Sequence, residues 1–346
     1  MKRCLIQENQ RQRNRYYHNK RSDFMIVKER GVPIKVVKLE ALLRRLPANH
    51  GKRPLIEEEL AIARAGFRGE QSIDYYLQLL PHPQNFFFHD LRLAVRDQFF
   101  QIDTLLAVPG YMLIIELKNI AGTILFEDQF QQMIRILDGK EERFPNPLLQ
   151  TSRQKMLLQE WLAQHKLPKT EIDSVTVFTH NKTIIKSSSK DPRLSQKVIH
   201  IEQLPHFIMQ MNQQQSTDTL MKKSQRQITS LLIKHHTPLE LDILQRFQIN
   251  EKELIKGILC PQCTALPMVR KRRKWHCPAC LTYSRDAHLN ALQDYYLLLR
   301  PTITNQQLRG FLQISCGQLA YYLLRSMNLA SQGTNKGKIY TLNFNS

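Results

Sequence analysis

The sequence contains no apolar run that approaches the ~18 residues needed to span a bilayer. Its N-terminus has no apolar core of the kind found in secretory signal peptides. These two absences predict a soluble protein of the cytoplasm. Acidic residues are also scarce, because 30 Asp and Glu stand against 50 Lys and Arg and leave a formal net charge of +20. Such an excess of positive charge predicts a polyanionic partner, either nucleic acid or an anionic membrane surface.

Cysteine is rare, with six residues in a chain of 346. Four of the six form two CxxC pairs, whereas Cys4 and Cys316 are isolated. This pattern fits a metal site in a reducing compartment better than a disulfide framework. The chain length allows two or three domains, and an apolar content of 42% predicts an ordinary hydrophobic core.

The residues from Gln101 to Asn119 predict two apolar strands joined by a tight turn at Pro109-Gly110. Proline and glycine suit the two central positions of such a turn. Antiparallel pairing around it places Val108 opposite Tyr111, and this fixes the register of both strands.

The same register places Asp103 opposite Glu116, and Gln101 opposite Lys118. Because side chains alternate between faces along a strand, Glu116 and Lys118 then share a face. Two opposed carboxylates about 5 Å apart destabilise a sheet, and a divalent cation would offset their repulsion. The alternative is a solvated sheet face on which Lys118 neutralises one acid.

An amphipathic helix is predicted at residues 69–80. Its stripe, at spacings of three and four, consists of Ile73, Leu77 and Leu80 together with Glu70. A carboxylate on an apolar stripe is costly unless it has a partner. Glu70 is therefore a candidate third ligand for the same cation, and the alternative is an acid that merely favours a helix N-terminus.

Strands and helices alternate around this helix and turn, which predicts an α/β core. The other predicted strands are 86–93, 99–108, 111–118, 123–126 at an edge of the same sheet, 175–180 and 197–201, and the other predicted helices are 146–164 and 204–212. The helix from Asn146 has Asn as its N-cap and Pro at its first position.

Five short motifs occur in the order found in one nuclease family. They are Gly66-Phe67-Arg68-Gly69-Glu70, His89-Asp90-Leu91, Gln101-Ile102-Asp103, Ile115-Glu116-Leu117-Lys118-Asn119 with Gly122, and Asn146-Pro147-Leu148-Leu149-Gln150. Residues 55–210 therefore resemble the nuclease-related domain (NERD) of the PD-(D/E)xK nuclease superfamily. Two departures are Thr104, where the family often has His, and Ile120, where it often has an aromatic residue. Neither departure removes an expected metal ligand.

This resemblance implies a restriction-endonuclease-like core, in which helices flank a mixed sheet. It also implies a metal-dependent nuclease that hydrolyses phosphodiester bonds of DNA. In such a site Asp103, Glu116 and the backbone carbonyl of Leu117 bind Mg²⁺ or Mn²⁺. Glu70 contributes a further carboxylate, directly or through water.

The resemblance also assigns roles near the metal to a lysine and a glutamine. Lys118 positions the attacking water or stabilises the negative charge of the transition state. Gln150, in the first turn of the helix that begins after Asn146, becomes a polar group of the active site. The alternative for Gln150 is an amide that faces solvent.

Two CxxC knuckles, each with proline inside, lie 13 residues apart. They are Cys260-Pro261-Gln262-Cys263 and Cys277-Pro278-Ala279-Cys280. This spacing predicts a zinc ribbon. Four thiolates leave no open coordination position, so Zn²⁺ would be structural in a module too small to fold alone. Redox chemistry is the alternative, but no βαβ pattern surrounds either pair.

Five consecutive cations lie between the knuckles: Arg270, Lys271, Arg272, Arg273 and Lys274. They repel one another on a small loop, and a phosphate backbone is the partner that best explains them. Trp275 follows and would either stack on a base or pack against the knuckle.

Three helices are predicted in the C-terminal segment, at 286–299, 305–313 and 316–328, and a hairpin leads into a strand at 339–342. This order predicts a winged-helix-like module that binds DNA. Its candidate groove contacts are Gln318, Tyr321, Tyr322 and Arg325. The alternative is a helical cap with no ligand.

The predicted organisation has six parts. They are a basic disordered arm (1–24), a helical extension (25–54), the NERD domain (55–212), a helical connector (213–256), the zinc ribbon (257–284) and the winged-helix-like module (285–346). Met25 is a second candidate for the natural start. Two functional alternatives to the nuclease remain: a non-catalytic DNA-binding, RNA-binding or regulatory protein, and a scaffold on RNA, ribosomes or anionic membrane.

Overall fold

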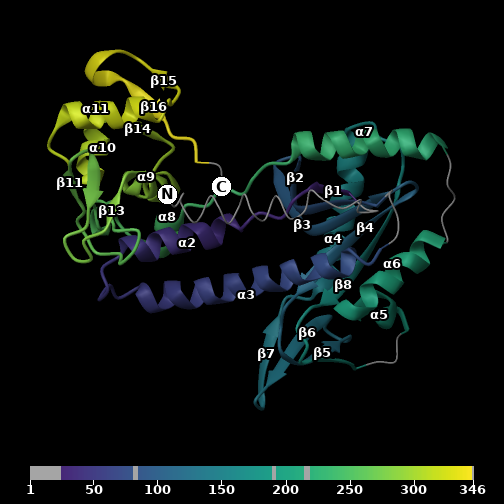
Figure 1. The fold of residues 1–346 in the computed structure, drawn as a ribbon. Coiled ribbons are helices and arrows are strands. Elements are labelled where there is room, and N and C mark those ends of the chain that lie inside the picture. The colour runs from purple at the N-terminus through teal and green to yellow at the C-terminus, as the bar shows by residue number, and fades with distance from the viewer. Residues whose placement is uncertain (1–24, 81–84, 189–191, 214–218, 345–346) are drawn as a thin grey trace. The chain divides into compact units, whose positions relative to one another are not determined.

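A computed structural model describes residues 25–80, 85–188, 192–213 and 219–344, and Figure 1 labels the elements. The arm predicted at residues 1–24 lies outside the described residues. The chain divides into two compact units, each built from two stretches of sequence. Unit 1 consists of residues 1–30 and 68–238, and unit 2 consists of residues 31–67 and 239–346. Within the described ranges, no helix is both long and apolar enough to cross a membrane.

Unit 1 is built on a six-stranded mixed sheet with the order β1-β2-β3-β4-β8-β10. Its strands are β1 (Met25–Lys28), β2 (Phe86–Val95), β3 (Gln98–Val108), β4 (Tyr111–Lys118), β8 (Glu171–Phe178) and β10 (Val198–His200). β2, β3 and β4 pair antiparallel, whereas β1, β8 and β10 each run parallel to their neighbour. Val108 pairs with Tyr111 around the Pro109-Gly110 turn, which confirms the predicted register at that end.

A second, four-stranded sheet in unit 1 has the order β7-β6-β5-β9. It consists of β5 (Gly122–Glu127), β6 (Gln132–Leu137), β7 (Lys140–Phe144) and β9 (Thr183–Ser187). The prediction that 123–126 extends the main sheet was therefore wrong. β4 already pairs with β8 at that edge, and Gly122 turns the chain away with a φ of 104°, which favours glycine.

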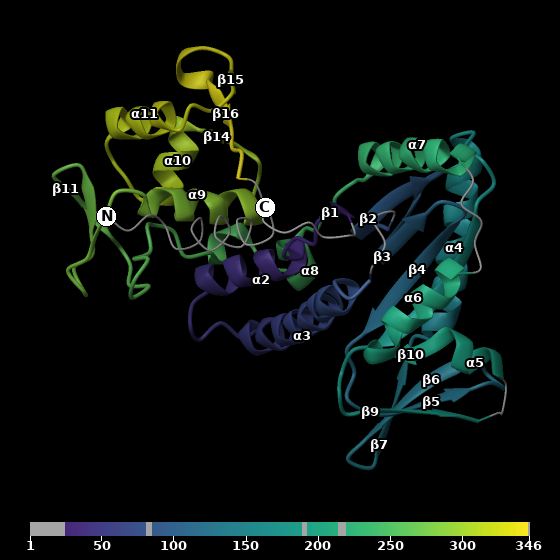
Figure 2. The same ribbon diagram turned by 45° about the vertical axis from the view of Figure 1, so that its right-hand side comes forward.

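Helices cover both faces of the main sheet, as expected for a mixed sheet flanked by helices (Figure 2). α4 (Pro147–Gln164) and α7 (Thr219–His235) share a core with one face, to which they contribute Trp161 and Leu232 among others. The C-terminal part of α3 (Arg53–Leu77) and α6 (Leu204–Gln213) share a core with the other face. The predicted cap of α4 is confirmed, because Leu148 N donates to the Asn146 side chain at 2.9 Å.

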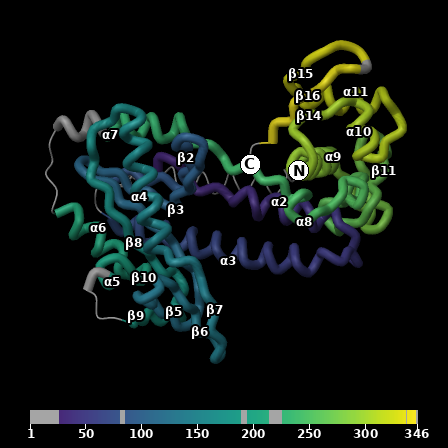
Figure 3. The backbone as a smooth tube through the Cα atoms, turned by 180° about the vertical axis from the view of Figure 1, so that it is seen from behind, coloured from purple at the N-terminus to yellow at the C-terminus, as the bar shows by residue number. Residues whose placement is uncertain are grey.

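Unit 2 contains two hydrophobic cores, and its chain can be followed in Figure 3. The first joins α2 (Ile34–Arg45), the N-terminal part of α3, α8 (Ile243–Phe247) and the end of α9 (Ala287–Leu298). The second joins the cysteine segment, with strands β11 (Val269–Lys271), β12 (Lys274–His276) and β13 (Tyr283–Ser284), to the C-terminal helices. The cysteine segment and the helices after it are therefore packed as one body.

The C-terminal segment has the order helix, strand, helix, helix, strand, strand. Its elements are α9, β14 (Thr302–Thr304), α10 (Asn305–Leu312), α11 (Gly317–Ser326), β15 (Ser331–Gln332) and β16 (Ile339–Thr341), and the sheet order is β14-β16-β15. α10 begins with a capping box, because Gln307 N donates to Thr304 Oγ1 and Thr304 N donates to Gln307 Oε1.

Candidate active site and cysteine cluster

The regular pairing of the central strands is interrupted at two acidic residues. The register on either side of Asp90 in β2 places it opposite Asp103 in β3, but neither residue forms a regular ladder pair. Asp90 has a φ of 50°, which is uncommon for a residue other than glycine. On β3, Leu105 and Ile102 share one hydrophobic core although they are three residues apart, so the two-residue alternation shifts at this point. Both acids therefore lie at a local distortion of the sheet, a feature common next to active sites.

Glu116 and Lys118 lie on one face of β4, as the sequence predicted. Lys118 Nζ is 2.6 Å from Glu116 Oε1, and it also donates to Gln150 Oε1 at 3.2 Å. Glu116 is only 1% exposed, so a solvated sheet face does not describe this arrangement. Gln150 reaches Lys118 from α4 rather than facing solvent alone. The predicted pairing of Gln101 with Lys118 is not part of the β3–β4 ladder, whose described pairs end at Thr104 and Ile115.

Gln154, which the sequence analysis missed, holds the other side of the Glu116 carboxylate. Its Nε2 donates to Glu116 Oε2 at 3.0 Å and to the backbone oxygen of Gln101 at 2.9 Å. Gln154 is buried and lies one helical turn after Gln150. This spacing of four residues on α4 was the available signal, because such residues share a helix face.

Glu116 and Glu70 are the acids that act on Asp103, and no cation of the described residues forms an ion pair with it. The Asp103 carboxylate accepts a hydrogen bond from Leu117 N, which lies 3.0 Å from Oδ2. Burial, followed by the charges of Glu116 and Glu70, raises the pKa of the Asp103 carboxyl well above its usual value, and Lys118 offsets this only in part. A carboxylate in this situation favours a cationic ligand.

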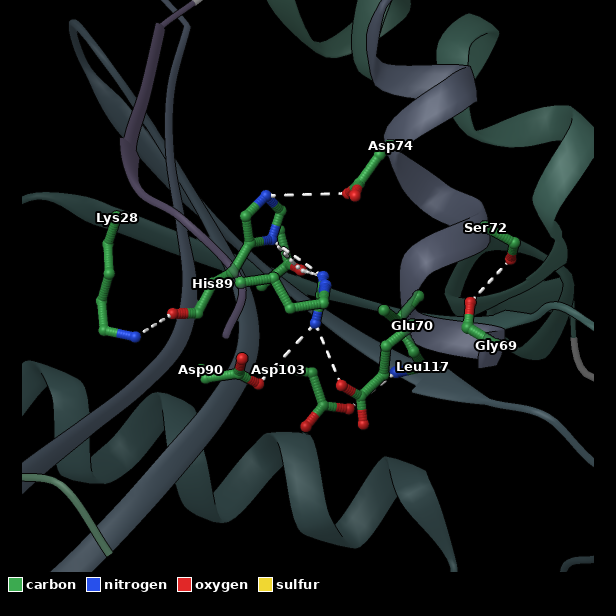
Figure 4. A network of polar contacts seen from close by, with 11 residues as sticks. Lys28, Gly69, Glu70, Ser72, Asp74, His89, Asp90, Asp103 and Leu117 are labelled. Carbon is green, nitrogen blue, oxygen red and sulfur yellow. Dashed lines mark hydrogen bonds and ion pairs between the residues drawn. The ribbon is translucent and has the colours of Figure 1, made fainter. Parts of the chain in front are cut away.

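Glu70 reaches the site from α3 through a close contact between this helix and the sheet. A Cβ atom on Gly69 would lie 2.4 Å from Asn119 Cβ, so glycine lets α3 approach the end of β4. The charge of Glu70 acts on Asp103, and Figure 4 shows both side chains in the same part of the site. Burial, together with the neighbouring Asp90, raises the pKa of Glu70 to about 7.

Arg30 lies among these acids, and the sequence analysis did not identify it. Its Nη1 is 3.1 Å from Glu70 Oε2 and 3.7 Å from Asp90 Oδ1. Its Nη2 is 2.8 Å from His89 Nδ1 and 3.0 Å from Thr104 Oγ1. Burial lowers the pKa of His89 to about 3, so this imidazole is neutral at physiological pH and its Nδ1 accepts a hydrogen bond from Arg30 Nη2.

The oxygen ligands of this site fit Mg²⁺ or Mn²⁺ by their chemistry. Among the described residues, however, Glu70, Asp103 and Glu116 do not form a group whose ligand atoms all lie within 4.8 Å of one another. Arg30 contacts one oxygen of Glu70, and Lys118 contacts one oxygen of Glu116. Asp103 is therefore the acid of the three that most needs a cation. The arrangement fits a cation centred on Asp103 better than one shared equally by three carboxylates.

The four knuckle cysteines converge on one point in unit 2. Their sulfur atoms lie within 4.8 Å of one another, with Cys260 and Cys280 3.6 Å apart and Cys263 and Cys277 3.5 Å apart. A tetrahedral zinc with Zn–S bonds of about 2.3 Å requires sulfur atoms ~3.8 Å apart. The cluster therefore fits Zn²⁺ and leaves no ligand position for a substrate.

Trp275 is part of the core of this module rather than its surface. It is 2% exposed, and its Nε1 donates to His288 Nδ1 at 3.1 Å. Arg270 is only half-exposed because its guanidinium lies 4.7 Å from the Trp275 ring centroid. The exposed cations of the loop are Lys271, Arg272, Arg273 and Lys274, and the exposed candidates on α11 are Gln318, Tyr321, Tyr322 and Arg325.

Comparison with protein families matches residues 65–179 to the model described as NERD, the nuclease-related domain. Neither the curated proteins nor the solved structures compared gave a match. The matched residues include Glu70, Asp103, Glu116, Lys118 and Gln150. Arg30 and the cysteine cluster lie outside them.

Proposed function

Because the chain carries a nuclease-related domain over residues 65–179, we propose that it is a metal-dependent nuclease that hydrolyses phosphodiester bonds of DNA. The observation that carries this proposal is the position of Asp103. It lies near Glu70 and Glu116 at a distortion of the sheet, and within the described ranges it has no cationic partner of its own. The non-catalytic alternative offers no reason to keep three acids in this arrangement.

In the proposed site, Asp103, Glu116 and the backbone carbonyl of Leu117 would hold Mg²⁺ or Mn²⁺, with Glu70 as a further carboxylate. When bound, such a cation polarises the scissile phosphate and lowers the pKa of a water molecule. Lys118 then supplies a positive charge toward the attacking water or the charge that develops on the phosphate.

Two glutamines on α4 keep the catalytic side chains in position. Gln150 accepts a hydrogen bond from Lys118 and so limits the directions in which its ammonium group points. Gln154 donates a hydrogen bond to Glu116 and so restricts the orientation of that carboxylate. Fixed geometry of this kind matters because a displacement of about 1 Å costs on the order of 100-fold in rate.

The C-terminal part of unit 2 would bind the nucleic acid. The element order of α9 to β16 supports a winged-helix-like module, and the four cysteines support a zinc ribbon that shares its core. The exposed cations of the β11–β12 loop and the exposed side chains of α11 would contact phosphates and bases.

Replacing Lys118 with Met tests the catalytic role directly. We expect cleavage of DNA with Mg²⁺ or Mn²⁺ to fall by about 100- to 1,000-fold, as is typical when one group that stabilises transition-state charge is removed. Plasmid, linear and single-stranded DNA would each be assayed. Lys169→Met, at an exposed lysine of the same unit, is the matched control and should cut at the wild-type rate.

The same assay decides between the two main proposals. Wild-type protein that binds all three DNAs but cuts none of them would favour the non-catalytic DNA-binding, RNA-binding or regulatory protein.

The β11–β12 loop offers a second test, because its turn can be changed without changing its shape. Arg272 and Arg273 have φ of 45° and 64°, values that suit Asn-Gly in a two-residue hairpin. A variant with Arg272→Asn, Arg273→Gly, Lys271→Gln and Lys274→Gln should keep the hairpin. We expect the slope of log K for DNA against log salt to become shallower by about 3–4, since each lost phosphate contact removes ~0.9.

A control for this loop variant is Arg96→Gln, which removes one exposed cation from unit 1. It should change the slope by at most about 1. An unchanged slope in the loop variant would show that these four cations do not contact phosphates.

A further inference from the structure

Arg30 contacts acids and neutral partners from three different elements of unit 1. Its guanidinium reaches Glu70 on α3, His89 and Asp90 on β2, and Thr104 on β3. The planar guanidinium has five donors in a fixed fork, which suits such a set of partners better than a lysine would.

The Arg30 side chain is only 3% exposed, so it cannot act as a clamp on the substrate phosphate. Its position is set by the strand just before it, since β1 pairs with β2 in parallel and ends at Lys28. Lys28 Nζ donates to the backbone oxygen of His89 at 2.7 Å and fixes the same segment to β2. Arg30 is therefore held within the site by the N-terminal strand, outside the residues that match the nuclease-related domain.

We infer that Arg30 is a positioning residue of the nuclease site, which holds the Glu70 carboxylate toward the divalent cation at Asp103. This inference rests on the proposed function. Nη1 takes up Glu70 Oε2, and no hydrogen bond from another described residue engages Glu70 Oε1, which can face the cation or a water bound to it. Asp90 and Thr104, through their own contacts with Arg30, keep the guanidinium from following Glu70 if that side chain moves.

Two physical effects of removing Arg30 oppose each other. Loss of a nearby positive charge by itself strengthens the binding of a cation. Loss of the contact frees Glu70, and removal of a group that orients a metal ligand typically costs 10- to 100-fold in affinity or activity. The positioning role requires the second effect to be the larger one.

The test is a double-mutant cycle on Mn²⁺ affinity, measured on the full zinc-loaded chain without nucleic acid by the EPR signal of free Mn²⁺. Arg30→Gln and Glu70→Gln are each expected to weaken Mn²⁺ binding by about 10-fold. If Arg30 acts through Glu70, the double variant should lose about 10-fold as well, rather than the ~100-fold of independent effects. Asp103→Asn should abolish binding at the site.

Two further variants keep the cycle interpretable. Arg96→Gln removes a surface arginine that pairs with Glu160 in the same unit, and it should bind Mn²⁺ as the wild type does. Arg30→Lys keeps the charge but not the fork, and an intermediate loss is expected. If Arg30→Gln does not fold by circular dichroism, the cycle is run with Arg30→Lys.

The outcomes separate this inference from the proposed function. Additive losses, an unchanged affinity, or tighter Mn²⁺ binding in the Arg30 variant would overturn the positioning role, while cleavage by the wild type and its loss in Asp103→Asn would leave the nuclease intact. A wild type that neither binds Mn²⁺ nor cuts DNA would overturn both.

Discussion

Asp103→Asn is expected to abolish metal-dependent cleavage and, at the same time, to stabilise unit 1 when no Mg²⁺ or Mn²⁺ is present. Activity should fall because an amide is a poor substitute for an anionic ligand of a hard cation. Stability should rise because the variant removes a carboxylate that lies beside Glu116 and Glu70 and is poorly solvated. Asn Oδ1 can still accept the hydrogen bond from Leu117 N. Single stabilising substitutions typically contribute about 0.5–2 kcal/mol, and we expect a gain in this range.

The pH dependence of this gain follows from the raised pKa of Asp103. A group whose pKa is higher in the folded state favours folding while it is protonated, and this contribution is lost as the pH rises through the folded pKa. Below the unfolded pKa of about 4, Asp103 is neutral in both states, so wild type and Asp103→Asn should have similar stability there. The advantage of the variant should then grow as the pH rises.

Urea unfolding reports on unit 1 alone if it is followed by the fluorescence of Trp161. The chain has two tryptophans, Trp161 in unit 1 and Trp275 in unit 2, so both proteins would carry Trp275→Phe. Lower stability of Asp103→Asn at neutral pH, or a gain that does not depend on pH, would contradict the electrostatic description of this site.

Cys277→Ser is expected to unfold much more than the segment that carries the cysteines. Cys277 and Cys260 are buried in the same core as Leu308, Phe311 and other residues of the C-terminal helices. Structural zinc supplies about 10–16 kcal/mol at neutral pH in small modules that depend on it. Loss of the cluster should therefore remove amide-exchange protection from α9, α10 and α11 together, while the main sheet of unit 1 keeps its protection.

Cys316→Ser provides a matched control with the same change of side chain. Cys316 is exposed, lies outside the cluster, and caps α11 through a hydrogen bond from Leu319 N at 3.4 Å. Serine is a good N-cap, so this variant should retain one Zn²⁺ per chain and equal or exceed wild-type protection. Hydrogen exchange read by mass spectrometry and zinc content by atomic absorption would distinguish the two variants. Normal protection of α9–α11 in zinc-free Cys277→Ser would show that the helices fold without the cluster.

Local patterns in the sequence were sufficient for the parts of the site that a short loop or a single helix fixes. The Pro109-Gly110 turn determined the pairing of β3 with β4, and the helical spacing around Glu70 placed that acid toward the sheet. The predicted pairing was wrong near Gln101, because the strands leave the regular pattern at Asp90 and Asp103. No residue type in the sequence indicates that change.

Contacts between distant segments were beyond the reach of the sequence pattern. Arg30 lies 40 residues before Glu70, and the parallel pairing of β1 with β2 has no connecting turn that would set its register. Gln154 was missed although its spacing from Gln150 was visible. The cysteine segment and the C-terminal helices were predicted as separate modules, and their common core became evident only from packing.

The interrupted path of unit 2 has a consequence for synthesis on the ribosome. Residues 31–67 carry Leu39, Leu42 and Ile56, which are fully buried against side chains from beyond residue 239, such as Ile243 and Leu297. Residues 68–238 emerge in between, which takes roughly 10–30 s at ordinary elongation rates. During that interval the two helices of residues 31–67 expose apolar side chains whose packing partners have not yet been synthesised. This exposed apolar surface would be a substrate for a holdase chaperone.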